Sequence, residues 1–101
     1  MHDPLISALS LCRKAGALVT GFDPVKDSVF TGKARLVLLA SDLSPKTAQR
    51  VQHFCEDFVE CAALPCTMEQ LSAVTRKPAG VFAVTDPNLA NLCKSKLPKE
   101  E

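Results

Sequence analysis

The 101-residue sequence has no tryptophan, no tyrosine and only two histidines, and it lacks long apolar stretches. No run approaches the roughly 18 apolar residues that a membrane-spanning helix needs. The first residues also lack the basic segment followed by an uninterrupted apolar run that marks a secretory signal. We therefore predict a cytoplasmic protein that does not contact a membrane.

Motifs of the common nucleotide-binding and hydrolytic enzymes are missing as well. There is no Gly-x-Gly-x-x-Gly after a predicted strand, no Gly-x-x-x-x-Gly-Lys-Ser/Thr and no Gly-x-Ser-x-Gly turn. The apolar stripe of the predicted helix around His53 consists of Ala48, Val51, Cys55 and Phe58. This stripe would turn His53 toward water, as a surface histidine rather than a catalytic base. We predict no enzymatic activity, cofactor or small-molecule substrate.

Five cysteines are present, an odd number that argues against a complete disulfide framework. Cys61 and Cys66 are separated by four residues, which is not the Cys-x-x-Cys spacing of redox and zinc sites. Cys12 and Cys93 follow leucines at helical spacing and are expected in the core. We predict reduced thiols and no metal site. The alternative is a thiol-dependent enzyme, which would require a cysteine of low pKa.

Positive and negative charges almost balance, with a formal net charge of +1. This value excludes the strongly basic profile of a protein that coats nucleic acid without specificity. The distribution is uneven, because residues 56–75 contain four acidic and no basic side chains, whereas 76–99 contain five basic and one acidic. Any interaction with nucleic acid must therefore depend on where the fold places the cations.

Proline and capping residues mark the predicted helix starts. In four places a residue that can cap a helix precedes proline, which suits the first helical position: Asp3-Pro4, Asp23-Pro24, Ser44-Pro45 and Asp86-Pro87. Thr67, followed by Gln70, predicts a fifth start as a capping box. Gly16 and Gly32 are expected to end the first two helices, since a left-handed backbone is common there.

Short apolar runs between these helices predict four strands, at residues 17–20, 36–40, 60–64 and 81–85. The run 36–40 contains no polar residue, which predicts a central strand with helices on both faces. About five helices alternating with four strands predict a three-layer α/β/α sandwich with a four-stranded mixed sheet. We expect residues 1–94 to form one domain and 95–101 to form a flexible charged tail.

Lys46 and Arg50 occupy the first two turns of the predicted third helix, where the helix dipole disfavours cations. Within that helix neither residue has an oppositely charged partner three or four positions away. A phosphate bound near the helix start would stabilise this arrangement. The alternative is a solvated face on which the cations are tolerated at a small cost.

The segment 20–26 joins the end of a strand to the start of a helix through Gly21, which presents free backbone N–H groups to an anion or a base edge. Lys26 and Lys33 would add positive charge nearby. Asp23 either contacts RNA or caps its own helix. Phe22 either stacks on a base or packs against the sheet.

Arg76 and Lys77 form a basic loop that runs into the last predicted strand. Such a loop can clamp a phosphate backbone or can simply be solvated. An RNA site built from both segments requires this loop and the glycine at residue 21 to lie side by side.

Five segments of the sequence resemble one protein family: residues 9–16, 20–21, 31–42, 68–71 and 81–86. The Gly-Lys-Ala-Arg-Leu-Val run at 32–37 is the most specific of them. From about residue 5 to 93 the chain is similar to the L-seven-Ae and L-thirty-e type ribosomal proteins, which bind kink-turn RNA, and most to short bacterial ribosome-associated members. The resemblance implies the α/β/α sandwich, with RNA at the start of the second helix and at the loop before the last strand.

Kink-turn binders have a small residue, asparagine and glutamate after the family glycine, and the last two contact sheared G·A pairs. Here Phe22, Asp23 and Pro24 occupy these positions, and Asp27 stands where the family has lysine. Aspartate lacks the amide donor of asparagine, and proline has no side-chain acceptor.

We predict a non-enzymatic RNA-binding protein, ribosomal or ribosome-associated, that binds rRNA or another structured, kink-turn-like RNA. The predicted RNA-binding residues are Gly21, Phe22, Asp23, Lys26, Lys33, Lys46, Arg50, Arg76 and Lys77. The alternative hypothesis is a protein–protein interaction module on the same fold that has lost kink-turn recognition.

Overall fold

The computed structural model describes residues 4–56, 58–76 and 79–97. Within them helices and strands alternate along the chain. The helices are α1 (Pro4–Lys14), α2 (Phe22–Phe30), α3 (Pro45–Cys55), α4 (Met68–Thr75) and α5 (Pro87–Lys96). The strands are β1 (Leu18–Thr20), β2 (Leu36–Leu39), β3 (Cys61–Ala63) and β4 (Val81–Val84). No helix in this part of the chain has the length and apolar character needed to cross a membrane.

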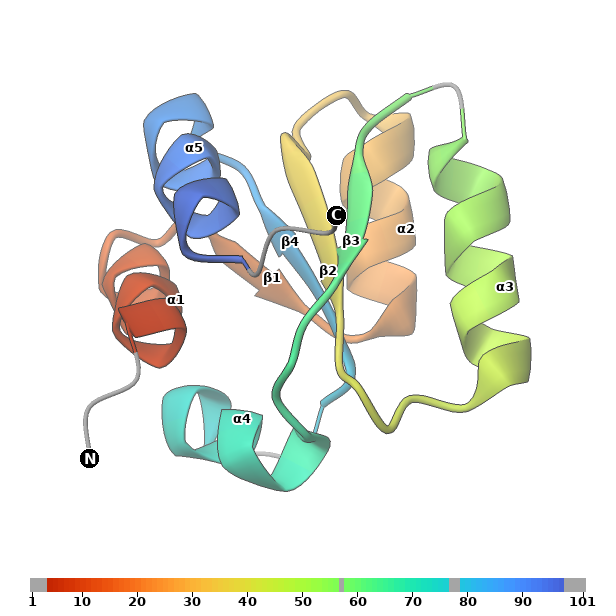
Figure 1. The fold of residues 1–101 in the computed structure, drawn as a ribbon. Coiled ribbons are helices and arrows are strands. Elements are labelled where there is room, and N and C mark those ends of the chain that lie inside the picture. The colour runs from red at the N-terminus through yellow and green to blue at the C-terminus, as the bar shows by residue number, and fades with distance from the viewer. Residues whose placement is uncertain (1–3, 57, 77–78, 98–101) are drawn as a thin grey trace.

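The four strands form one mixed sheet in the order β1-β4-β2-β3 (Figure 1). β4 pairs antiparallel with both β1 and β2, and β2 pairs parallel with β3. The central strands β2 and β4 are buried at every position, whereas the edge strands β1 and β3 are partly exposed. The prediction that residues 36–40 contain a central strand is confirmed.

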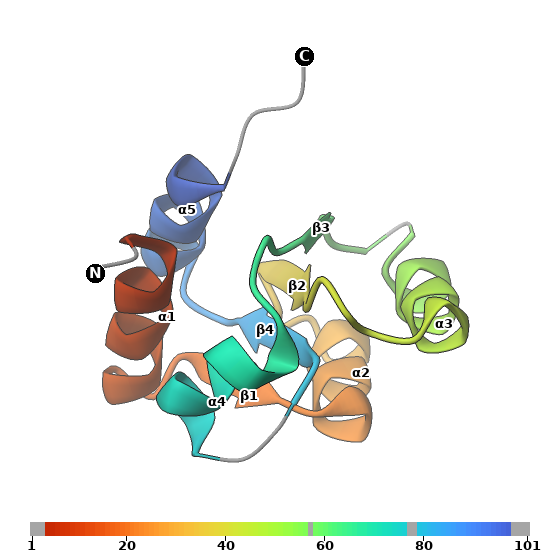
Figure 2. The same ribbon diagram turned by 60° about the horizontal axis from the view of Figure 1, so that its bottom comes forward.

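Helices cover both faces of the sheet, so the molecule has three layers (Figures 1 and 2). Residues of β2 point alternately into two separate cores. Leu36 and Leu38 belong to the core built with α1, α4 and α5. Val37 and Leu39 belong to the core built with α2 and α3. The predicted α/β/α sandwich with a mixed sheet is confirmed.

Four of the predicted local features determine where helices begin and end. The Thr67 hydroxyl accepts from the backbone N–H of Gln70 in a capping box, and Asp86 accepts from the first two N–H groups after Pro87. Gly16 and Gly32, with φ of 71° and 77°, follow the ends of α1 and α2. These predictions are confirmed. At the other end of the chain α5 extends two residues into the segment expected to be a tail.

α2 begins two residues earlier than predicted. The N-cap is Gly21, whose φ of 98° lets the chain turn into the helix directly after β1, and no side chain among the described residues caps it. Asp23 lies inside the first turn, so the prediction that it caps the helix is wrong. Ser44 does precede α3, but its side chain makes no capping hydrogen bond within the described chain. Asp3, the predicted cap of α1, lies outside the described residues.

Candidate nucleic-acid interface

One end of the sheet brings together connections that are far apart in the sequence. The Gly21 N–H donates to the Val81 carbonyl at 2.9 Å, which ties the start of α2 to the start of β4. The Ala40 N–H donates to the Gly80 carbonyl at 2.9 Å, which ties the end of β2 to the same segment. We call residues 21–23, 40–46 and the described part of 76–81 the sheet-end surface; Figure 2 brings this end of the molecule forward.

Arg76 is the C-cap of α4 and begins the connection to β4. Its φ of 65° is left-handed, which is uncommon for a residue other than glycine. The side chain is exposed. Lys77, predicted beside it as a second phosphate contact, lies outside the described residues. Because Gly21 is bonded to Val81, the two segments that the RNA hypothesis requires to be neighbours lie at the same end of the sheet.

The N-termini of α2 and α3 both open onto the sheet-end surface without a side-chain cap among the described residues. By contrast, α4 and α5 are capped by Thr67 and Asp86. The first N–H groups of a helix have no acceptor within it and carry a partial positive charge. Two uncapped helix starts at one end of the sheet are therefore suited to bind the oxygens of an anion.

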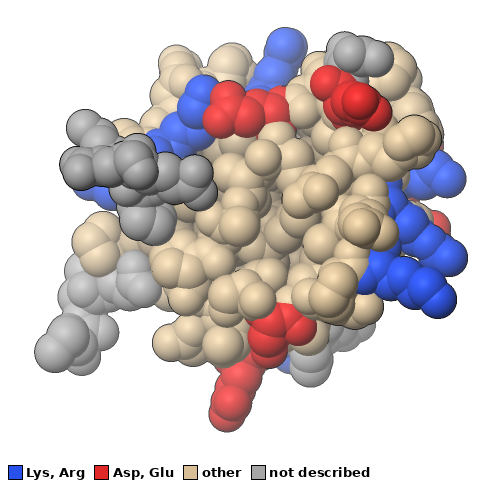
Figure 3. Space-filling model, turned by 45° about the vertical axis from the view of Figure 1, so that its right-hand side comes forward, with Lys and Arg blue, Asp and Glu red and all other residues tan. Residues whose placement is uncertain are grey.

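Three of the predicted cations lie on α2 and α3. Lys26 is on α2, and Lys46 and Arg50 are in the first two turns of α3, as expected. The ion pairs found within the described residues are His53–Glu56, at 3.8 Å, and Lys94–Glu60, at 2.7 Å. No described carboxylate therefore pairs with Lys26, Lys46 or Arg50. Figure 3 shows a cluster of basic side chains on the side where α2 and α3 lie.

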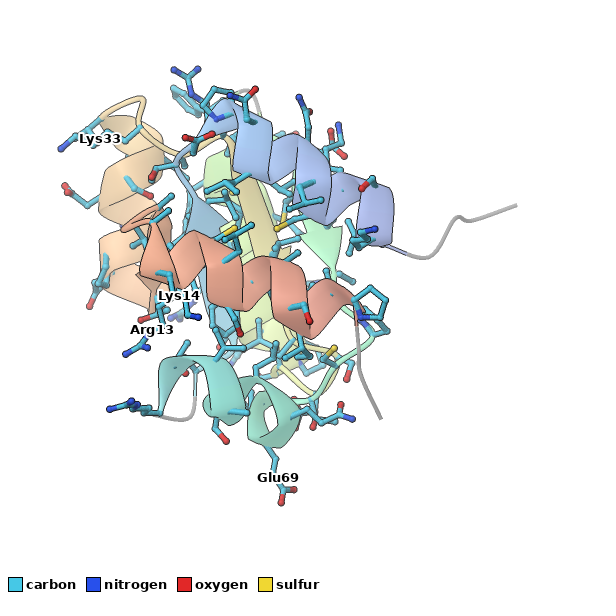
Figure 4. The ribbon with its side chains drawn as sticks, turned by 90° about the vertical axis from the view of Figure 1, so that its left-hand side faces the viewer. Arg13, Lys14, Lys33 and Glu69 are labelled. Atoms are coloured by element: carbon cyan, nitrogen blue, oxygen red, sulfur yellow. The ribbon has the colours of Figure 1, made fainter. Side chains whose placement is uncertain are left out.

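Lys33 is not brought together with Gly21. It follows the C-terminal end of α2, and a helix of nine residues spans about 13 Å. Figure 4 shows Lys33 well away from Arg13 and Lys14, which lie at the end of α1 beside the end of α4. Arg13 and Lys14 are exposed cations that extend the basic character of the region around Arg76.

Carboxylates are also present near the sheet-end surface. One oxygen of Asp42 accepts from the Met68 N–H at 2.9 Å, which holds the start of α4 against the β2–α3 connection. Asp23 and Asp27 are on α2, and both are exposed. The sheet-end surface and its surroundings are therefore of mixed charge, and the cations of this region are concentrated on α3 and at the ends of α1 and α4.

A groove of about 420 Å³ separates the outer sides of α2 and α3, and it is lined by Phe22, Lys26, Phe30, Arg50, His53 and Phe54. Three of these residues were predicted to contact RNA, and the groove brings them together. Phe30, His53 and Phe54 were not. A sequence signal for this groove was present. Phe22, Lys26 and Phe30 are spaced four residues apart, which predicts that they share one face of a helix.

Phe58 corrects the predicted apolar stripe of α3. The helix ends at Cys55, and Phe58 is 65% exposed rather than part of the core. His53 is exposed, as predicted. The stripe was assigned as if the helix continued for three more residues, which explains the error.

Four of the five cysteines are buried, and Cys61 is partly exposed. All five are free thiols, and Cys12 and Cys93 lie with their sulfur atoms 3.6 Å apart in the core. Burial raises the pKa of Cys55 to about 12 and also raises the pKa of Cys61. The hydrogen bond with Cys93 lowers the pKa of Cys12, whose side chain is fully buried. A thiol with a raised pKa is a poor nucleophile at neutral pH. Among the described residues no group of three or more His, Cys, Asp or Glu side chains could hold a metal ion.

These features define a small α/β/α protein whose candidate binding surface lies at one end of a mixed sheet. The model of the "Ribosomal protein L7Ae/L30e/S12e/Gadd45 family" matches residues 4–94, and the chain belongs to this family. The resemblance inferred from the sequence segments is thereby confirmed. No curated protein matches the chain significantly.

Solved structures share the fold. A protein of unknown function from Bacillus halodurans is 23% identical, with a TM-score of 0.87 over 94% of this chain and 97% of that one. The 15.5kD RNA binding protein of Giardia lamblia is 20% identical, with a TM-score of 0.73 over 92% of this chain and 81% of that one. At these identities the likeness supports the architecture and nothing finer.

Proposed function

We propose that the protein is a non-enzymatic, ribosomal or ribosome-associated protein of the cytoplasm that binds structured RNA at the sheet-end surface. The observation that carries this proposal is the hydrogen bond between Gly21 and Val81, which joins the uncapped start of α2 to the strand entered by the Arg76 loop. Membership of a ribosomal protein family supports it. So does the name of the Giardia protein that shares the fold, which is an RNA-binding protein.

The chemistry of the surface favours contacts to phosphate and to base edges through the backbone. Helix-start N–H groups that no side chain caps, together with the cations Lys46, Arg50 and Arg76, can bind phosphate oxygens, which position an RNA without reading its sequence. Asp23 and Pro24 replace the asparagine and glutamate of kink-turn binders. We therefore infer that a kink-turn-like bend is recognised mainly by its backbone shape.

Salt dependence of RNA affinity tests the proposal. The probes are a kink-turn RNA and a regular hairpin of the same length, and the variant combines Lys26→Ala with Arg76→Gly, since glycine accepts the left-handed backbone at residue 76. Removal of charge-assisted hydrogen bonds to phosphate should lower affinity about tenfold. The slope of log affinity against log salt should fall by roughly 0.7–0.9 for each phosphate that the variant no longer neutralises.

The matched control is Lys33→Ala combined with Lys96→Ala, which removes the same charge from exposed positions away from Gly21. The control should bind RNA almost as well as the unaltered protein. Equal weakening in both double variants would mean that only net charge matters. Unchanged affinity in the Lys26 and Arg76 variant would favour a protein-interaction module instead.

A further inference from the structure

Phenylalanine is concentrated at one place outside the core. Four of the five phenylalanines form a ladder of rings across α2, α3 and the segment that follows α3, and the fifth, Phe82, is buried in the sheet. The ring of Phe54 lies 5.6 Å from that of Phe22 and 6.1 Å from that of Phe30. The ring of Phe30 lies 5.6 Å from that of Phe58 in an edge-to-face contact. This ladder lines and extends the groove between the two helices.

The outer rings of this ladder are exposed to a degree that core packing does not explain. Phe30 is 53% exposed and Phe58 is 65% exposed, whereas Phe54 is buried beneath them. Large exposed aromatic side chains that are grouped rather than scattered indicate a surface that contacts a partner. The groove volume of about 420 Å³ is within the range of about 300–1,000 Å³ that is usual for sites of small ligands.

Two cations and a histidine are interleaved with these rings. Lys26 lies between Phe22 and Phe30 on the same side of α2, and Arg50 and His53 flank Phe54 on α3. No described carboxylate lines the groove. Asp23 and Asp27 directly follow Phe22 and Lys26, and adjacent helical residues point about 100° apart, so these aspartates lie on the next side of α2.

One acidic and one basic side chain lie close to the groove without lining it. Glu56 is 3.8 Å from His53 and accounts for one negative charge at its edge. Lys46 precedes Arg50 by four residues and adds a positive charge on the same side of α3. The occupant best matched to the groove therefore carries negative charge beside a flat, weakly polar ring.

An unpaired nucleotide has this chemistry. Bases in a double helix hide their faces by stacking on one another, so only an unpaired base can lie against an aromatic side chain. A helical peptide would instead require a continuous apolar stripe, which Lys26, Arg50 and His53 interrupt. The groove also begins at Phe22, directly after Gly21, so a strand that leaves the sheet-end surface can continue into it.

We propose that the groove between α2 and α3 receives an unpaired nucleotide of the bound RNA, with its base against Phe30 and its phosphate between Lys26 and Arg50. This inference rests on the proposed function, because it extends the same RNA beyond the sheet-end surface. It assigns a role to the one exposed aromatic cluster in the described chain, and it predicts that part of the RNA affinity depends on an aromatic ring at residue 30.

The test compares an RNA hairpin with the same hairpin carrying a single-stranded adenosine extension that includes 2-aminopurine. In the unaltered protein the extended hairpin should bind more tightly, and the 2-aminopurine fluorescence should be quenched by stacking. Phe30→Leu keeps an apolar side chain without an aromatic face. It should weaken binding of the extended hairpin about 5- to 100-fold, the effect of removing one base–aromatic stack, and abolish the quenching. Binding of the plain hairpin should not change.

Phe30→Tyr restores the aromatic face and should restore both affinity and quenching. Leu11→Ala is the matched control, because Leu11 is 48% exposed on α1 and is not part of the groove. Thermal unfolding of each variant separates loss of binding from loss of folding.

The outcomes distinguish this inference from the proposed function. If the unaltered protein binds neither RNA, the proposed function fails. If Phe30→Leu binds the extended hairpin as well as the unaltered protein does, the groove inference fails and RNA binding stands. Equal weakening of both hairpins would also overturn the groove inference, because the ring would then act on the whole surface.

Discussion

Replacing Gly80 with alanine tests how closely the sheet-end surface is packed. Gly80 is buried, and an added Cβ would lie 2.6 Å from Cδ1 of Leu43 and 3.0 Å from Sδ of Met68. A carbon atom does not approach another at 2.6 Å, so Leu43 would have to move. Overpacking of this kind costs about 1–3 kcal/mol, and because both obstacles are ends of flexible side chains we expect about 1–2 kcal/mol. The melting temperature should fall by about 4–8 °C for each kcal/mol.

The assay is thermal unfolding followed by circular dichroism, carried out in two backgrounds. In a Leu43→Ala background the 2.6 Å contact is absent, so Gly80→Ala should cost clearly less than in the unaltered protein. Gly32→Ala is the control, because no atom lies within 4 Å of its added Cβ and its cost comes from a φ of 77°. That cost, about 1–2 kcal/mol, should be the same in both backgrounds. An equal cost of Gly80→Ala in both backgrounds would refute the packing argument.

Two further predictions follow from the caps and the thiols. Asp86→Ala removes an acceptor from two backbone N–H groups and should lower the free energy of unfolding by about 1 kcal/mol, whereas Ser44→Ala, at an N-cap without such a bond, should have almost no effect on thermal unfolding. Cys55 should resist alkylation at neutral pH in the native protein, as judged by mass spectrometry, because burial raises its pKa to about 12. Since the unfolded thiol ionises near 9.0, stability should fall as the pH rises from about 9 to about 12, and Cys55→Ala should reduce that fall.

Much of the local structure could be predicted from short sequence patterns. Thr67 with Gln70, and Asp86 before proline, determine helix starts through hydrogen bonds that span three residues or fewer. Gly16 and Gly32 end helices because the backbone there is left-handed. The apolar run in β2 predicted burial on both faces, and the structure places it at the centre of the sheet. Such interactions involve neighbours along the chain, so they can be inferred without the fold.

The start of α2 shows where this approach failed. Asp23 before Pro24 has the pattern of a helix cap, yet the helix begins at Phe22. The Gly21 N–H is held by Val81, sixty residues away in the sequence, and this bond orients the chain as it leaves β1. A local pattern was therefore overridden by a tertiary contact. Phe58 is a similar case, because the exposure of its ring depends on where α3 ends.

The sequence by itself determined the alternation of helices and strands, most helix ends, and the residue types available to bind an anion. Only the tertiary structure decided the strand order β1-β4-β2-β3, which places Gly21 beside the segment that follows Arg76 and sends Lys33 to the far end of α2. It also decided that Phe22, Phe30 and Phe54 meet across two helices. The physical reason is that backbone dihedrals and caps depend on adjacent residues, whereas strand pairing and helix packing depend on contacts between segments far apart in the chain.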